Sequence, residues 1–280
     1  MLIPMPWPSS SAEYYWDATA GAYQSATRIS IDDFHYGPLL PGDRELGMLP
    51  QPVGGLRCLE VGCGAGQNSI YLARQGAHCV AVDISTRQLA HGKRLAEQNH
   101  ATIAFRHDNM DELSVEGQET FDLVHSTYAL PFSTNPARSL QQFARLLVPG
   151  GTLLLTTSHP LYSGEWMEFE SGDNGLLLHG YFRPPADVRP AESGHVGIAS
   201  TFHPVGAVHQ WLRDAGLQID RLLEPEPMPI PEMSEEDIQA RVPYDSPDWR
   251  ELYPVLSRIP TVVIFRCTKP PQNRGQNHVR

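Results

Sequence analysis

The residues from Glu60 to Gly66 combine a carboxylate with three glycines at alternate positions, in the pattern Glu-x-Gly-x-Gly-x-Gly. An apolar run precedes this pattern, and a second apolar run ends at Asp83, twenty-one residues after Gly62. Glycine has no Cβ atom, so a turn built from glycines lets the backbone approach a bound molecule closely. A carboxylate at the end of the next strand can accept hydrogen bonds from both hydroxyls of a ribose. The spacing therefore predicts a site for a cofactor that contains a nucleoside.

The spacing of Gly62, Gly64 and Gly66 distinguishes between two classes of such cofactors. A dinucleotide fingerprint that started at Gly62 would need Gly or Ala at position 67, where this chain has Gln67. The carboxylate of Glu60 would also repel a pyrophosphate, but it suits a cofactor with an ammonium group and no phosphate. S-adenosylmethionine (SAM) is such a cofactor. In these residues the chain resembles the class I SAM-dependent methyltransferases, in particular their small-molecule, methyltransferase type 11-like branch.

The resemblance covers about Tyr14 to Lys269 and implies a role for each cofactor contact. Asp83 would bind the ribose hydroxyls, Asp108 the adenine amino group, and the backbone N–H after it a ring nitrogen of the adenine. Glu60 would orient the glycine turn or act on the amino group of the cofactor. The expected cofactor contacts are Tyr23, Glu60, Gly62, Gly64, Gly66, Asp83, Ile84, Asp108, Asn109, Met110 and Ser126.

Seven short apolar runs are the predicted strands that position these residues. Helical patterns alternate with them, which predicts an α/β fold with a doubly wound, mostly parallel sheet. The resemblance implies a Rossmann-like sheet of seven strands, with helices on both faces and an antiparallel last strand. The predicted strands are Leu56–Val61, Ala77–Val82, Thr102–His107, Thr120–Ser126, Thr152–Ser158, Leu217–Leu223 and Thr261–Cys267.

Two of the helical patterns begin with recognisable caps. Ser85 and Gln88 are spaced as a capping box, in which each would satisfy a free N–H of the other's backbone. Asn135 precedes Pro136, which is typical of an N-cap followed by the first helical residue. The sequence Pro-Gly-Gly at residues 149–151 is expected to end that second helix.

The reacting centre of such a fold lies beyond the carboxyl ends of its strands. The fourth and fifth predicted strands end near Tyr128 and His159, which are therefore candidate catalytic residues. His159 is the leading candidate base because imidazole titrates near neutral pH; the alternative is a backbone cap before Pro160. His203 takes the expected N-cap position before Pro204, where Ser, Thr, Asp or Asn is favoured. This indicates a substrate contact, with an ordinary surface histidine as the alternative.

We expect one methyltransferase domain over residues 1–280, with two long insertions. Residues 159–202 are rich in aromatic side chains and are expected to form a lid. Residues 224–259 are acidic and rich in proline, which favours a solvated excursion or a dimer contact beside the active site. Residues 14–50 would form N-terminal cap helices, whereas residues 1–12 and 269–280 are expected to be disordered.

The composition argues against several partners. The formal net charge is −11 and the pI is about 5.5, whereas nucleic-acid enzymes normally carry a basic patch. No apolar run approaches the ~20 residues that a membrane helix needs. The four cysteines form no C-x-x-C pair and no secretion signal is evident, so we expect a cytoplasmic protein. We also expect no metal site and a possible homodimer.

The leading hypothesis is methyl transfer from SAM to a small organic acceptor, at oxygen, nitrogen or carbon, in the biosynthesis of a secondary metabolite. A SAM-binding protein with other chemistry, such as a cyclase, or with no catalysis, is the alternative because function depends on the site and not on the fold. An NAD-dependent oxidoreductase is disfavoured by Glu60, by Gln67 and by the lack of a Tyr-x-x-x-Lys pair.

Overall fold

The structure is a computed structural model that describes residues 9–114, 120–172, 174–189 and 198–271. Its centre is a seven-stranded sheet with the strand order β11-β13-β6-β5-β2-β3-β4. β13 runs antiparallel to both of its neighbours, β11 and β6. The strands from β6 to β4 in this order pair in parallel. The predicted fold class is confirmed. The strands are β2 (Arg57–Val61), β3 (His78–Asp83), β4 (Ile103–His107), β5 (Phe121–Thr127), β6 (Leu147–Ser158), β11 (Gln218–Leu223) and β13 (Val262–Thr268).

Six of these strands match their predicted runs to within one residue at each end, and β6 is the exception. It begins at Leu147 and not at Thr152. Leu147 pairs with Phe121, and the N–H of Gly150 donates to the carbonyl oxygen of Lys269 at 2.7 Å. The Pro-Gly-Gly sequence therefore lies within the sheet, and the helix before it ends one residue earlier than β6 starts.

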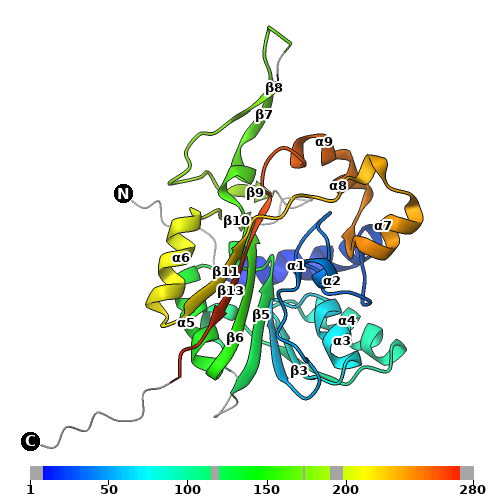
Figure 1. The fold of residues 1–280 in the computed structure, drawn as a ribbon, viewed down its shortest axis with the longest axis vertical. Helices are drawn as coiled ribbons and strands as arrows, with labels where there is room; N and C mark the ends of the chain where they lie inside the picture. The colour runs from blue at the N-terminus through cyan, green and yellow to red at the C-terminus, as the bar shows by residue number, and fades with distance from the viewer. Residues whose placement is uncertain (1–8, 115–119, 173, 190–197, 272–280) are drawn as a thin grey trace, which may run out of the picture.

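Helices cover the two faces of the sheet (Figure 1). One apolar cluster joins side chains of the central strands to α5 and α6, through residues such as Phe143 and Leu212. The other cluster joins the opposite face to α3 and to residues 34–53, through Leu72 and Phe34. Both faces of the central strands are thereby buried, which explains their mostly apolar sequences. The helices are α1 (Ser9–Ala26), α3 (Gln67–Arg74), α4 (Thr86–Gln98), α5 (Pro136–Leu146) and α6 (Val205–Asp214).

The predicted helix caps are largely confirmed. The Ser85 hydroxyl accepts from the backbone N–H of Gln88, and the Asn135 side chain accepts from that of Arg138. The Gln88 side chain does not reach back to the cap. It instead accepts a hydrogen bond of 2.9 Å from Gln24 on α1, so one half of the capping box is replaced by a contact between helices.

The chain ends differ from the expectation at the residues that the structure describes. Helix α1 begins at Ser9, so the prediction of disorder for residues 1–12 is wrong for residues 9–12. The ammonium group of Lys269 donates to the carbonyl oxygens of Ala144 and Leu147, both at 2.8 Å, which fixes the chain just after β13. Residues 1–8 and 272–280 lie outside the described residues.

The first insertion forms short strands outside the main sheet. A hairpin of β7 (Glu165–Glu168) and β8 (Asn174–Leu177) extends from one end of the molecule (Figure 1). β9 (Asp187–Arg189) then pairs with β10 (Ile198–Ser200).

The second insertion is more than a solvated acidic excursion, because it has a small core of its own. Leu39 packs there with buried residues of the insertion such as Ile238 and Leu256. Its strand β12 (Tyr244–Asp245) pairs with β1 (Arg28–Ile29) near the N-terminus. The other elements are η5 (Ile230–Glu232), α7 (Glu235–Arg241), α8 (Pro247–Glu251) and α9 (Tyr253–Leu256). Among the described residues no helix is both long and apolar enough to cross a bilayer.

Candidate active site

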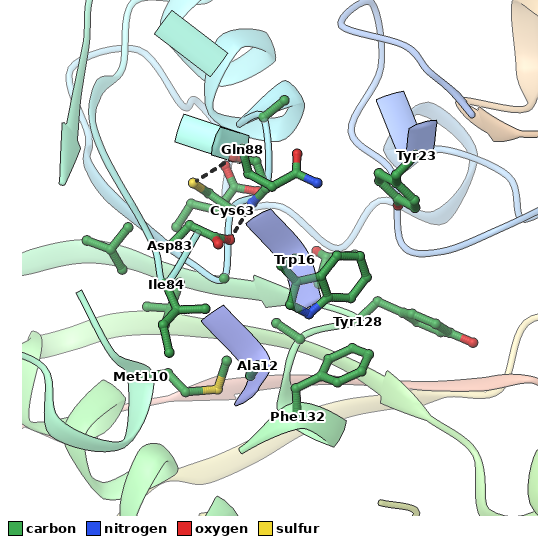
Figure 2. Close-up of a pocket in the computed structure, with 18 of the residues that line it drawn as sticks. Ala12, Trp16, Tyr23, Cys63, Asp83, Ile84, Gln88, Met110, Tyr128 and Phe132 are labelled. Atoms are coloured by element: carbon green, nitrogen blue, oxygen red, sulfur yellow. Dashed lines mark hydrogen bonds between the residues drawn. The ribbon is translucent and has the colours of Figure 1, made fainter. Parts of the chain in front are cut away.

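A cavity of about 200 Å³ lies at the carboxyl ends of β2, β3, β4 and β5. Its walls come from α1, the glycine turn, the ends of these strands and both insertions. Figure 2 shows Asp83, Ile84 and Met110 at one side of the cavity, and Tyr23 and Tyr128 at the other. We call the first side the nucleoside end and the second side the acceptor end.

The three glycines of the turn all have positive φ angles: +70° at Gly62, +55° at Gly64 and +70° at Gly66. Residues other than glycine rarely adopt this region of backbone angles. A Cβ atom at Gly62 would also lie 2.3 Å from the Cβ of Ala129 after β5. The turn therefore needs glycine for its backbone angle and, at Gly62, for space.

Asp83, the last residue of β3, is hydrogen-bonded to the glycine turn. Its Oδ2 accepts a hydrogen bond of 2.7 Å from the N–H of Gly64, and its Oδ1 accepts one of 2.8 Å from Ser85. Each carboxylate oxygen has a further lone pair for a ligand. Burial raises the pKa of Asp83 above its ordinary value. The group lines the cavity, as expected for a ribose contact.

Glu60 lines the cavity and holds the start of α3, the helix that follows the glycine turn. Its Oε2 accepts from the backbone N–H of Ser69 at 3.0 Å and from the Ser69 hydroxyl at 2.6 Å. These bonds hold the first turn of α3. Glu60 is buried, and burial raises its pKa to about 7.

Ile84, Asp108, Asn109 and Met110 line the nucleoside end, as predicted. Asp108 accepts from the backbone N–H groups of Asn109 at 2.8 Å and of Ser114 at 2.9 Å. The N–H of Asn109 was expected to reach a ring nitrogen of the adenine. In the structure it donates to Asp108 instead, because the chain turns tightly into the 3-10 helix that starts at Met110.

Tyr23 lines the cavity from α1, and its hydroxyl lies 2.6 Å from that of Tyr244 in the second insertion. Trp16 lies about two turns earlier on the same face of α1. Its ring contacts those of Tyr23 and Phe132 edge-on, with centroid distances of 5.7 and 5.3 Å. The aromatic residues of α1 therefore form a wall of the cavity.

Ser126 is not among the described residues that line the cavity, so the structure gives no support to this predicted cofactor contact. Its side chain is buried and donates to the carbonyl oxygen of Val61 at 2.8 Å. Because side chains alternate along a strand, the next residue, Thr127, is the one that reaches the cavity.

His159 is not among the residues that line the cavity, and both of its ring nitrogens are engaged. Nδ1 accepts from the N–H of Leu161 at 3.2 Å and Nε2 lies 3.0 Å from the carboxylate of Glu224. The ring is 4% exposed, and burial lowers its pKa below the ordinary value. The alternative interpretation, a backbone cap, fits this geometry, and the structure does not support His159 as the base.

His203 does not take the N-cap position expected for it. Pro204 is the N-cap of α6, so His203 lies one residue outside the helix. Its Nε2 lies 3.1 Å from the hydroxyl of Thr201, and its ring packs edge-on against Trp211 at 5.0 Å. These contacts satisfy the ring away from the cavity.

Tyr128 is the one catalytic candidate that the structure places at the cavity. It has a φ of +63°, which is unusual for a residue with a side chain. Its N–H donates to the carbonyl oxygen of Thr156 at 3.0 Å, which fixes this conformation. Burial raises the pKa of its hydroxyl well above the ordinary value, so the hydroxyl stays protonated.

Four residues of the acceptor end were not predicted: His35, Arg189, Tyr244 and Trp249. They come from segments far apart in the chain, and no local motif surrounds them. His35 is 8% exposed, its Nδ1 has no partner among the described residues, and burial lowers its pKa to about 3. The sequence showed that the two insertions are rich in aromatic and acidic residues. This composition did not indicate which of their residues would line the cavity.

The charges of the cavity fit SAM better than a dinucleotide. Four acidic residues line it: Glu60, Asp83, Asp108 and Asp111. They favour a ligand that is cationic and carries no phosphate. A Cβ atom at Gly64 would meet no heavy atom within 4 Å, so the backbone of the turn is open to such a ligand there. Within the described part of the chain, no three His, Cys, Asp or Glu side chains gather as a potential metal site.

Comparison with known proteins also indicates a methyltransferase. Residues 59–155 match the family model described as a methyltransferase domain. The ubiquinone biosynthesis O-methyltransferase of Maricaulis maris is 32% identical over 191 residues, which are 64% of this chain and 69% of that protein. That of Roseobacter denitrificans is 36% identical over 115 residues, 41% of this chain and 46% of the relative. The chain thus spans about half the length of several curated relatives that it matches.

A solved structure is similar over most of the fold. The crystal structure of an S-adenosylmethionine-dependent methyltransferase from Mesorhizobium loti superposes with a TM-score of 0.62 and 25% sequence identity. The match covers 80% of this chain and 94% of that one.

Proposed function

Because the chain belongs to the class I SAM-dependent methyltransferases, we propose that it transfers a methyl group from SAM to a small organic acceptor. One observation carries the proposal: Asp83 holds Gly64 at 2.7 Å, so that a carboxylate and an open glycine turn face the same cavity. The other acidic residues of the nucleoside end make this cavity suitable for a cationic cofactor.

Different residues of the cavity would contact different parts of the cofactor. Asp83 would accept hydrogen bonds from the ribose, whereas Ile84 and Met110 would pack against the adenine. Asp108 would face the adenine amino group. Tyr23 would close over the methionine portion. When bound, SAM supplies an electrophilic methyl group on a sulfonium, so the protein must mainly align the acceptor and exclude water.

Three features support a small acceptor. The cavity is enclosed by α1 and by both insertions, which leaves a limited volume. The net charge of −11 opposes a nucleic-acid acceptor. The relatives named above are O-methyltransferases of ubiquinone biosynthesis, which supports an oxygen acceptor for this chain as well. A homodimer and a cytoplasmic location stay predictions from the sequence.

Calorimetric titration of the purified protein tests the proposal. We expect SAM and S-adenosylhomocysteine to bind with micromolar affinity, NADH not to bind, and Asp83→Ala to abolish binding. Confirmed binding would be followed by a screen of phenols, amines and carbon acids with labelled SAM. Binding of NADH without either sulfur ligand would overturn the proposal in favour of an oxidoreductase.

A further inference from the structure

The acceptor end of the cavity contains one polar ring whose hydrogen bonds are not satisfied. The backbone N–H of His35 donates to Asn68 at 2.9 Å, which fixes the residue, but the buried Nδ1 has no partner in the described structure. The ring contacts Tyr244 edge-on at 5.4 Å. Buried polar atoms are nearly always hydrogen-bonded, so this imidazole indicates a place for a ligand atom.

A positive charge lies at the same end. Among the described residues that line the cavity, Arg189 is the one with a cationic side chain. Its Nε donates to Asp187 at 2.9 Å, which fixes the side chain. Its charge acts on the hydroxyls of Tyr23, Tyr128 and Tyr244, and it lowers the pKa of each of them against the larger effect of burial. The guanidinium therefore belongs to the acceptor end.

The two ends of the cavity thus differ in charge. The carboxylates lie at the ends of β2 and β3 and after β4, whereas Arg189 lies among aromatic rings on the insertion side. A cationic cofactor and an anionic acceptor would each be placed at the end of opposite charge. The rings of Tyr128, Tyr244 and Trp249 offer flat apolar surfaces to an aromatic molecule.

We propose that the acceptor end binds an aromatic acceptor as its oxyanion, with Arg189 supplying the charge and His35 an N–H hydrogen bond. This inference rests on the proposed methyltransferase function. The proton of the acceptor O–H goes to water when the acceptor binds. The freed electron pair of the oxygen then forms the bond to the methyl carbon, and the pair of the broken carbon–sulfur bond stays on sulfur.

His35 suits a donor of a hydrogen bond better than a base. Its neighbourhood is apolar, and burial keeps the imidazole neutral at pH 7, with one N–H and one lone pair. The charge that stabilises the oxyanion must therefore come from Arg189. The titratable groups around the two residues are Tyr15 and Tyr23 of α1, His125 of β5, Tyr128 after β5, Tyr162 of η3 (Pro160–Ser163), Asp187 of β9 and Tyr244 of β12.

The test uses 4-nitrophenol, whose anion is coloured, bound to the full chain loaded with S-adenosylhomocysteine. Its absorbance is followed against pH, and 4-nitroanisole is the probe that cannot ionise. We expect the bound phenol to ionise at least about one pH unit lower than the free phenol, which is a tenfold preference for the anion. Arg189→Gln should abolish this shift and Arg189→Lys should retain part of it. His35→Asn should reduce it.

Matched controls are exposed residues of the same types. Arg183→Gln and His78→Asn change surface side chains and should leave the shift intact. Binding of S-adenosylhomocysteine shows that each variant is folded. The proposal is overturned if the loaded wild-type protein does not bind the phenol, binds it without a shift, or binds 4-nitroanisole equally well. Failure of the wild-type protein to bind S-adenosylhomocysteine would instead contradict the proposed function.

Discussion

The carboxylate of Asp83 accepts a hydrogen bond of 2.7 Å from the backbone N–H of Gly64. The end of β3 therefore holds the turn that follows β2. The same carboxylate also accepts from Ser85, the N-cap of α4. One side chain thus fixes the two loops between which a nucleoside would lie, and the two sequence motifs form one structural unit.

Substitution of Asp83 tests this unit directly. Asp83→Ala removes the ribose contacts and the anchor of the glycine turn together. Hydrogen bonds to a charged group contribute about 1.5–3 kcal/mol each, so we expect the affinity for S-adenosylhomocysteine to fall at least about 100-fold by calorimetry. Asp214→Asn on the exposed face of α6 is the control. An affinity of Asp83→Ala within threefold of the wild type would contradict the role of Asp83.

Gly62→Ala separates the effect of backbone angle from that of space. Alanine at a positive φ costs about 1–2 kcal/mol, and the new Cβ would also meet Ala129 at 2.3 Å. Gly47→Ala is the matched control, since Gly47 has a φ of +56° and open space around it. Urea unfolding should show a larger loss for Gly62→Ala than for Gly47→Ala. Equal losses would mean that the turn relaxes away from Ala129 at no cost.

The pKa of Glu60 predicts a pH dependence of stability. Burial raises this pKa from 4.5 to about 7 in the folded chain. Between these values the folded state holds a proton that the unfolded state has lost, so stability falls as the pH rises. The change amounts to about 3 kcal/mol over this window at 1.36 kcal/mol per unit. Above about pH 7 the penalty is constant.

Glu60→Gln isolates this contribution, since the amide stays neutral at every pH. We expect the stability of Glu60→Gln relative to the wild type to increase from pH 4.5 to pH 7, as measured by urea unfolding without ligand. The difference between the two proteins cancels the contributions of buried histidines. Glu97→Gln, at an exposed position of α4, should show no such trend. A wild-type protein that gains stability relative to Glu60→Gln over this range would refute the prediction.

The sheet could be predicted closely because its central strands are buried on both faces. Runs such as Leu56–Val61 are mostly apolar and end at turn residues, so local sequence specifies them. The early start of β6 at Leu147 could not be seen in this way. It depends on the pairing with Phe121 and on the bond from Gly150 to Lys269, which join residues far apart in the chain.

The two ends of the cavity also differ in how far local sequence could predict them. The nucleoside end is built from consecutive residues after each strand, so Asp83 and its neighbours could be found by spacing. The acceptor end brings His35 together with Arg189 and Tyr244, and only the folded chain makes them neighbours. His159 was chosen for its place after a strand, but its partner Glu224 comes from another insertion.

His159→Ala tests the corrected view of this residue. The variant loses the cap of a short 3-10 helix and the contact with Glu224, so a stability loss of about 1 kcal/mol is expected. Because the ring does not line the cavity, the affinity for S-adenosylhomocysteine should stay within about twofold, and methyl transfer should be retained. Activity lost with unchanged stability and cofactor affinity would restore His159 as a catalytic residue.

The hydroxyl pair of Tyr23 and Tyr244 connects α1 to the second insertion across the acceptor end. The oxygens lie 2.6 Å apart, and Tyr244 is 4% exposed. Tyr244→Phe leaves the hydroxyl of Tyr23 without this partner, which costs about 1–3 kcal/mol. In Tyr23→Phe the hydroxyl of Tyr244 keeps its hydrogen bond with Trp249. We therefore expect Tyr244→Phe to lower stability by more than Tyr23→Phe or the double variant does.

A double-mutant cycle in urea unfolding measures this coupling, with Tyr181→Phe outside the cavity lining as the control. Coupling of at least about 1 kcal/mol is expected, since the two residues are in direct contact. The double variant should also bind S-adenosylhomocysteine better than either single variant, because the closed position of α1 is kept by apolar packing of the two rings. Additive losses would show that the hydroxyls act separately, and that α1 is held over the cavity by Trp16 and Phe132 instead.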